Sequence, residues 1–245
     1  MRKRLRDSRS GSRAASWYRC LVGAVLNIDL GELPGEPEEL YALAQLANVA
    51  CGGHAGDDAS MRRTVRVAQA HGVEVGAHPS YPDRAGFGRV SLALEPAVVA
   101  AAVAEQCAAL RAVAQALGVA VVSAKLHGAL YHDVARDHAL AAAVLDALVD
   151  ALGAIEIVSG PGALAELARA RGLIVRREGF ADRGLLPDGA LIPRGQPGAL
   201  IEDPGVAAAQ ARRLAASGTI DALCIHGDGA NPLAIVRAVR RALAR

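Results

Sequence analysis

Strand-like and helix-like segments alternate along most of this 245-residue chain. Runs rich in β-branched residues predict strands at 23–30, 46–51, 73–78, 119–126, 154–159, 173–179 and 220–226. Stretches rich in alanine and leucine predict helices at 37–46, 58–71, 95–117, 135–152, 161–171, 204–217 and 231–244. Such alternation requires helical crossovers, because two parallel strands cannot be joined by a tight turn. We predict an α/β fold, a single barrel domain of seven βα units over residues 20–245, with a doubly wound open sheet as the alternative.

Polar side chains gather where the predicted strands end. These residues are Asp29, Glu32, Asn48, His54, Asp57, His78, Asp83, Lys125, His127, Glu178, Asp182, Arg183, His226 and Asp228. In parallel α/β folds the carboxyl ends of the strands carry the site, and in a closed barrel these ends converge. The pattern therefore predicts one polar mouth. The Gly- and Pro-rich run 180–203 predicts a long functional loop rather than a helix.

Lys125 is the only lysine between residues 20 and 245, since Lys3 is the only other lysine in the chain. Elsewhere this chain uses arginine for positive charge. A lysine kept against that preference indicates a site that needs a compact ammonium rather than a planar guanidinium. The alternative is a surface lysine present by chance.

The charge of the chain is unevenly distributed. Residues 1–19 carry seven Arg or Lys against Asp7, a net +6, so residues 20–245 carry about −4 of the overall +2. The mildly acidic body lacks a basic stripe for nucleic acid. Residues 1–19 have three interpretations: a disordered basic leader, a nucleic-acid or membrane-surface arm, or a start-codon artefact with the true start near Val22 or Val25.

Neither a secretory signal nor a membrane span is expected. The basic stretch is not followed by an uninterrupted apolar segment with a cleavage site. The apolar stretch 96–124 contains Glu105 and Arg111, which fits a helix followed by a strand. Four cysteines at 20, 51, 107 and 224 are scattered without a CxxC pair. They predict reduced, buried thiols in the cytoplasm, with a reactive thiol at Cys51 or Cys224 as the alternative.

Six motifs follow one another in a characteristic order. They are Leu26-Asn27-Ile28-Asp29-Leu30-Gly31-Glu32, Asn48-Val49-Ala50-Cys51-Gly52-Gly53-His54-Ala55-Gly56-Asp57, Gly76-Ala77-His78-Pro79-Ser80-Tyr81-Pro82-Asp83, Lys125-Leu126-His127-Gly128-Ala129-Leu130-Tyr131, Phe180-Ala181-Asp182-Arg183 with Leu191-Ile192-Pro193-Arg194, and Cys224-Ile225-His226-Gly227-Asp228. In this order, over about residues 26–244, they resemble the LamB/YcsF family.

The resemblance implies a seven-stranded barrel of the glycoside hydrolase/deacetylase type. It also implies ATP-dependent opening of 5-oxo-L-proline (pyroglutamate) to L-glutamate, performed as the A component of a 5-oxoprolinase together with partner subunits B and C. The chain departs from the family pattern at Gly53, where Phe is usual, and at Leu185, where an aromatic residue is common. Leu126 replaces a usual Pro and His132 a usual Asn. Loss of two aromatic side chains is expected to widen the pocket, which bears on which lactam is accepted.

Hydrolysis of an amide needs an activated water, stabilisation of the oxyanion and a proton for the leaving nitrogen. The predicted catalytic residues are Asp29, His54, His78, Lys125 and His127. The predicted substrate-binding residues are Glu32, Asn48, Asp57, Tyr131, Asp182, Arg183, Arg194, His226 and Asp228. Among these, Arg183 or Arg194 is suited to clamp a substrate carboxylate. For each histidine the alternative is a structural hydrogen bond, and Asp57 or Asp58 could instead cap a helix.

ATP handling and metal binding are less constrained by the sequence. With Lys3 and Lys125 as the only lysines, the chain has no phosphate loop of the GxxxxGK[ST] type, so ATP is expected to bind at an unusual site or largely on the partners. If a divalent metal is present, Asp29, His54 and His78 are its expected ligands. A metal-dependent deacetylase or amidohydrolase is therefore one rival function. A lactam-binding subunit without chemistry of its own is the other.

Overall fold

The computed structural model of the protein describes residues 23–244, and the expectations for residues 1–19 and Cys20 lie outside the described residues. Seven parallel strands form a closed barrel in chain order, and β7 pairs with β1 to close it. The strands are β1 (Val25–Leu30), β2 (Leu46–Ala50), β3 (Glu74–His78), β4 (Val121–Ala124), β5 (Glu156–Ser159), β6 (Val175–Phe180) and β7 (Ala222–His226). The predicted barrel is confirmed, and the open sheet is excluded.

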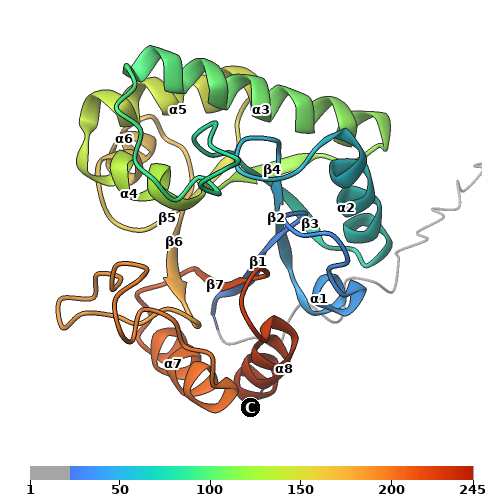
Figure 1. Ribbon diagram of the computed structural model, residues 1–245, viewed down its shortest axis with the longest axis vertical. Coiled ribbons are helices and arrows are strands. Elements are labelled where there is room, and N and C mark those ends of the chain that lie inside the picture. Colours follow the sequence, from blue (N-terminus) through green and yellow to red (C-terminus); the bar gives the residue numbers. More distant parts are fainter. Residues whose placement is uncertain (1–22, 245) are drawn as a thin grey trace, which may run out of the picture.

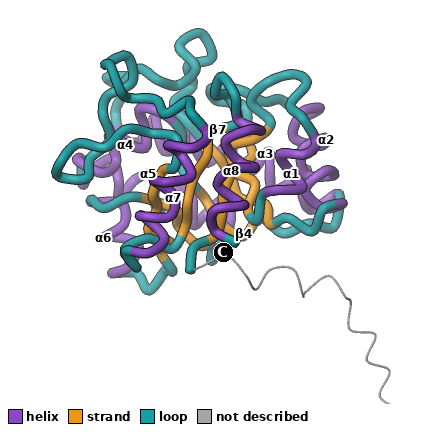
Figure 2. Tube along the Cα trace, turned by 90° about the horizontal axis from the view of Figure 1, so that it is seen from below, coloured by secondary structure: helices purple, strands orange, loops and turns teal. Residues whose placement is uncertain are grey.

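Helices surround the barrel, as Figures 1 and 2 show from two directions. They are α1 (Glu38–Leu43), α2 (Asp58–Ala70), α3 (Pro96–Ala116), α4 (Gly128–Arg136), α5 (His138–Leu152), α6 (Ala163–Ala170), α7 (Pro204–Ala216) and α8 (Pro232–Leu243). In Figure 1, α3 lies along α5 on one side of the barrel, and α7 lies beside α8 on the opposite side. Residues 181–203 contain no helix and are stabilised by two isolated bridges, as expected for a long loop.

The expectation for the segment after β4 was partly wrong. A single helix was predicted at 135–152, but the structure has α4 before it and α5 as a separate helix. The break lies at Asp137, whose backbone is extended and whose carboxylate accepts the N–H groups of Ala139 and Leu140. An aspartate that caps the second helix in this way ends the first one. The first of the two helices, α4, begins directly after His127.

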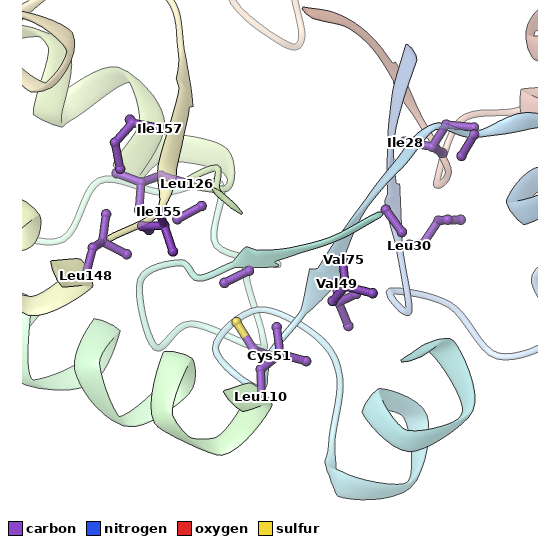
Figure 3. Packing of buried hydrophobic residues seen from close by; sticks show 14 of the residues in the cluster. Ile28, Leu30, Val49, Cys51, Val75, Leu110, Leu126, Leu148, Ile155 and Ile157 are labelled. Carbon is purple, nitrogen blue, oxygen red and sulfur yellow. The ribbon is translucent and has the colours of Figure 1, made fainter. Parts of the chain in front are cut away.

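Side chains on the outer face of the barrel form the hydrophobic core with the helices. Figure 3 shows Leu148 of α5 against Ile155 and Ile157, and Leu110 of α3 near Cys51. By length and composition α3 could cross a membrane. Its residues Val99, Val103, Cys107 and Leu110 are nevertheless buried in this core. The described cysteines are free and buried, as expected for reduced thiols.

The interior of the barrel changes from apolar to polar along its axis. A small separate apolar cluster inside the barrel consists of Leu46, Val158 and Ala222. Leu46 and Ala222 are the first residues of β2 and β7. Because side chains alternate along a strand, Asn27 and Asp29 of β1 share the face opposite to its core residues. Asn27 and Asp29 are both completely or almost completely buried. The barrel therefore encloses polar groups beneath its carboxyl-terminal mouth.

Candidate active site

The Lys125 ammonium and the Asp29 carboxylate form the buried centre of this mouth. Lys125 follows β4, and its Nζ lies 2.8 and 3.0 Å from the two carboxylate oxygens of Asp29 near the end of β1. Nζ also lies 2.9 Å from the Cys224 sulfur and 3.1 Å from Glu178 Oε1. Asn48 of β2 donates a further hydrogen bond of 2.8 Å to Asp29. Different strands or strand ends thus supply one connected network.

Charge pairing keeps this network ionised despite its burial. Burial alone would lower the pKa of Lys125, but the charge of Asp29 outweighs it and holds this pKa well above its usual value. Burial likewise opposes ionisation of Asp29, yet the charges of His78 and Lys125 hold its pKa well below the usual value. Burial raises the pKa of the Cys224 thiol, which therefore stays protonated. The centre is an ion pair rather than a pair of neutral groups.

Three histidines converge on Glu32 beside this ion pair. Oε1 of Glu32 lies 2.9 Å from Nε2 of His54, 3.2 Å from Nδ1 of His127 and 3.7 Å from Nε2 of His78. Nδ1 of His127 also lies 3.0 Å from Nε2 of His78. Nε2 of His78 lies 3.4 Å from Asp29, which connects the histidines to the ion pair.

Backbone carbonyls determine where two of these rings carry their protons. Nδ1 of His78 lies 2.8 Å from the carbonyl oxygen of Lys125, and Nε2 of His127 lies 3.0 Å from that of Phe87. A carbonyl oxygen only accepts hydrogen bonds, so both of these outer nitrogens are protonated. The inner nitrogens are consequently the ones that face Glu32 and each other. Phe87 itself adopts a positive φ of 53°, in a loop whose Gly88 packs against His54 and His127.

The three rings differ in their ionisation. Burial lowers the pKa of His54 to about 4 and also lowers that of His127. For His78 burial acts in the same direction, but the charge of Asp29 outweighs it and raises the pKa. Contacts with His127 and His54 outweigh burial and lower the pKa of Glu32. The place between Glu32 and Asp29, where Nε2 of His78 lies, is therefore the part of this cluster that most favours a positive charge.

A cavity of about 350 Å³ opens onto this centre. Its polar and aromatic lining consists of Asp29, His78, Arg89, Ser91, Lys125, His127, Tyr131, His132, Arg136, Phe180, Arg183, Arg194 and His226. Carboxylate, ammonium and imidazole groups thus share one space with several arginines, which is the convergence predicted from the strand ends. Glu32 and His54 do not line the cavity, because they lie behind His127, against which the ring of His54 is stacked.

Two of the arginines line the cavity without forming an ion pair in the described part of the chain. Arg183 is 3% exposed and donates to the carbonyl oxygens of Ala199 and Ile192. Within residues 23–244, neither Arg183 nor Arg194 has a carboxylate at ion-pair distance. Burial, followed by repulsion from Arg194, lowers the pKa of Arg183. A buried cation without an anionic partner is costly, so this wall of the cavity is suited to an anionic ligand.

The remaining predicted site residues occupy different environments. Tyr131 lines the cavity and accepts the N–H of Gly160, whereas Asp182 pairs with His226 at 3.0 Å. Asp228 lies outside the lining and forms an ion pair with Arg89. The structure does not bring Asp57 into the site. Its exposed carboxylate accepts the N–H of Ser60 in a capping box at the start of α2.

Sequence reasoning missed or underweighted several residues of this pocket. Glu178 was equally compatible with bracing a loop, but it contacts Lys125 and neither of its buried oxygens has a hydrogen bond among the described residues. Phe180 belongs to one of the six motifs but was given no role, and Arg136 lies outside all six. Arg89 follows the loop that holds Phe87, and no short motif marks it.

The expected widening of the pocket at Gly53 and Leu185 is not found. Neither residue lines the cavity. A Cβ at Gly53 would lie 2.3 Å from Oε1 of Gln106 and 2.3 Å from Oγ of Ser80. The side chain of Gln106, from α3, therefore occupies the space in which a larger residue at position 53 would lie.

Proteins of known sequence and structure resemble this chain over nearly its whole length. It is 45% identical to the 5-oxoprolinase A subunit of Symbiobacterium thermophilum, across 89% of this chain and 90% of that protein. It is 46% identical to the 5-oxoprolinase A subunit of Methylococcus capsulatus, across 89% of this chain and 91% of that protein.

Solved structures agree with the barrel. The lactam utilization protein from Thermus thermophilus superimposes with a TM-score of 0.83 at 39% identity, covering 90% of this chain and 95% of that one. A family 4 carbohydrate esterase from Streptomyces lividans reaches a TM-score of 0.50 at 15% identity, covering 92% of this chain and 89% of that one, a likeness of fold alone. The family model described as LamB/YcsF matches residues 25–245, and this chain is therefore a member of the LamB/YcsF family.

Proposed function

We propose that this chain is the A component of a 5-oxoprolinase, which opens 5-oxo-L-proline to L-glutamate with ATP hydrolysis in an assembly with subunits B and C. The observation that carries this proposal is one cavity that contains both the buried Lys125–Asp29 ion pair and two arginines, Arg183 and Arg194, without an ion-pair partner among the described residues. The names of the two related proteins and of the Thermus protein support the same substrate class.

The cavity matches the two functional groups of this substrate. 5-Oxo-L-proline has one carboxylate and one lactam amide on a small ring. Arg183 and Arg194 are suited to bind the carboxylate, because a guanidinium fork matches a carboxylate in a bidentate geometry. With the carboxylate at this wall, the lactam carbonyl would be directed toward Lys125 and Asp29.

The ion pair supplies the groups that lactam opening needs. As water attacks the carbonyl carbon, Asp29 would accept its proton and the Lys125 ammonium would stabilise the developing oxyanion. The proton would then pass to the ring nitrogen as the carbon–nitrogen bond breaks, which leaves a carboxyl group and an amine. The positive centre held by the histidines would make the attacking water more acidic. Phe180, stacked at 5.8 Å between ring centroids on His226, would help to exclude bulk water from one side.

ATP coupling fits a shared arrangement. The chain lacks a lysine-containing phosphate loop, so we assign nucleotide binding chiefly to the assembly with subunits B and C. In this proposal the partners use ATP to activate the lactam and this chain contributes the hydrolytic pocket.

The test is glutamate formation from 5-oxo-L-proline by the purified chain, with and without ATP and with and without subunits B and C. We expect glutamate and ADP in equal amounts only when all components are present. The Lys125→Met protein, assembled with the same partners, is the matched control for contamination. Equal glutamate formation by subunits B and C alone would overturn the proposal.

A further inference from the structure

Three donor atoms, two of them on histidines that line the cavity and one on Glu32 behind His127, form a triangle of metal-ligand size. Its sides are 3.0 Å between Nδ1 of His127 and Nε2 of His78, 3.2 Å between His127 and Oε1 of Glu32, and 3.7 Å between His78 and Glu32. Ligand atoms bound at roughly 2.0–2.2 Å around tetrahedral zinc lie about 3.3–3.6 Å apart. The planes of the two imidazoles differ by 89°, so the two rings are not stacked and their inner nitrogens can approach one ion from different directions.

The outer nitrogens of these two rings are anchored as those of metal-binding histidines are. His78 and His127 each donate to a backbone carbonyl, of Lys125 and Phe87 respectively. This arrangement fixes the tautomer and directs the other nitrogen inward. Two inward lone pairs and a carboxylate, with side chains no more than 5% exposed, would repel one another without a positive centre among them. Either a proton or a metal ion must supply it.

His54 belongs to the cluster as a positioning residue. Its ring is stacked on that of His127, with centroids 3.6 Å apart and planes 2° from parallel. Two parallel stacked rings cannot both direct an in-plane lone pair at one ion, whereas the Nε2–H of His54 can donate to Oε1 of Glu32 at 2.9 Å. The second oxygen of Glu32 is buried and accepts no hydrogen bond from any described residue, so it is free to face an ion.

A second group of donors, Asp29, Cys224 and His226, is excluded as the ion site. The Lys125 ammonium already lies within 3.0 Å of Asp29 and of the Cys224 sulfur. A divalent cation there would be repelled by that ammonium. The same argument removes Asp29 from the ligand set expected from the sequence.

We propose that Glu32, His78 and His127 hold one divalent transition metal ion of the zinc type, and that His54 orients Glu32. Two imidazoles and one carboxylate suit zinc and its neighbours, and three protein ligands leave a position open toward the cavity that His78 and His127 line. When bound, such an ion would acidify a water or polarise a carbonyl. Only this catalytic consequence rests on the proposed function, because the site itself is defined by the donors.

The experiment measures zinc binding directly. The full chain is treated with a chelator, dialysed and titrated with zinc chloride by calorimetry, with native mass spectrometry giving the stoichiometry. We expect one ion per chain with a Kd below about 1 μM. Cobalt(II) in place of zinc should give the visible absorption of a tetrahedral or five-coordinate site. Wild-type protein that binds less than about a tenth of an equivalent at about 100 μM zinc would overturn the proposal.

Variants identify the ligands. Glu32→Gln and His127→Gln should weaken zinc binding at least about a hundredfold, and His54→Gln about tenfold. The matched control is His71→Gln on the outer surface, where His71 contacts Glu38, and it should bind as the wild type does. Zinc binding that is unchanged in both folded ligand variants would overturn the proposal. If these variants do not fold, an anomalous difference map of the zinc-loaded wild type decides, and an ion located elsewhere refutes the site.

The two proposals fail in distinguishable ways, because zinc binding is measured without substrate. Stoichiometric zinc at these residues without glutamate formation by the assembly would leave the metal site intact and reject the lactam function. Full glutamate formation by an assembly whose chain binds no metal would reject the metal site and leave the lactam function intact.

Discussion

Replacing Lys125 by Met tests whether the buried ion pair holds the mouth of the barrel together. The substitution keeps a side chain of similar length but removes the ammonium, which is 3% exposed and lies 2.8–3.1 Å from carboxylate oxygens of Asp29 and Glu178. Glu178 would then be buried without a cation, and of its ion-pair contacts Asp29 would keep only the one with His78 at 3.4 Å. Removing one partner of a buried pair costs about 3–5 kcal/mol, because the charge left behind is uncompensated.

The assay is urea unfolding of the isolated chain at neutral pH, followed by circular dichroism. We expect Lys125→Met to lower the free energy of unfolding by about 3–5 kcal/mol. The double variant Lys125→Met/Asp29→Asn removes one orphaned charge and should recover at least about 1 kcal/mol relative to the sum of the two single variants. Arg177→Met serves as the control, because its ion pair with Asp221 is about half exposed and should contribute at most about 1 kcal/mol.

Activity should fall with the same substitution. Loss of one oxyanion-stabilising group lowers kcat by a factor of about 10²–10³, so we expect at least about a hundredfold loss of glutamate formation by the assembled enzyme. A Lys125→Met protein as stable as the wild type, with strictly additive single and double variants, would refute the reasoning about the ion pair. A variant that is destabilised as expected but remains fully active would refute only the assignment of Lys125 as the oxyanion-stabilising group.

Three further substitutions test individual assignments. Arg194→Gln should raise the KM for 5-oxo-L-proline about tenfold and leave kcat nearly unchanged, because it removes a cation from the carboxylate-binding wall; an unchanged KM would reject this role. Asp57→Ala should destabilise the chain by about 1 kcal/mol in urea unfolding through loss of the α2 cap, with KM unaffected; a raised KM would return Asp57 to the site. Gly53→Ala should destabilise by about 1–3 kcal/mol, since the new Cβ would lie 2.3 Å from Gln106 and Ser80; equal stability would show that Gln106 moves aside easily.

The barrel itself could be predicted from the sequence because it depends on local patterns. Alternating strand and helix signals predict parallel strands, and the structure closes them into a barrel rather than the open sheet that was the alternative. The one clear error was α4: residues 128–134 were not predicted to be helical, and the helix predicted at 135–152 ran across residue 137. The Asp137 side chain interrupts it by capping α5, and a cap of this kind is a weaker signal than an apolar run.

Convergence of the site was also predictable, since strand ends meet at the mouth wherever a parallel barrel closes. For Asp29, His78, Lys125 and His127 this was sufficient, and all four line one cavity. It was not sufficient for Asp57, because a position just past a strand is equally the start of the following helix. The Asp57 carboxylate caps α2 and does not line the cavity.

Pairing within the site was decided by the tertiary structure alone. Nothing in the sequence favoured one pairing over another among the acidic and histidine residues at the strand ends. These residues are Asp29, Glu32, His54, His78 and His127. The barrel places the Lys125 ammonium on Asp29 and leaves Glu32 to face three imidazoles. A strand position defines height along the barrel axis, but which charges meet depends on distances of about 3 to 4 Å across the barrel, and only the closed fold determines those.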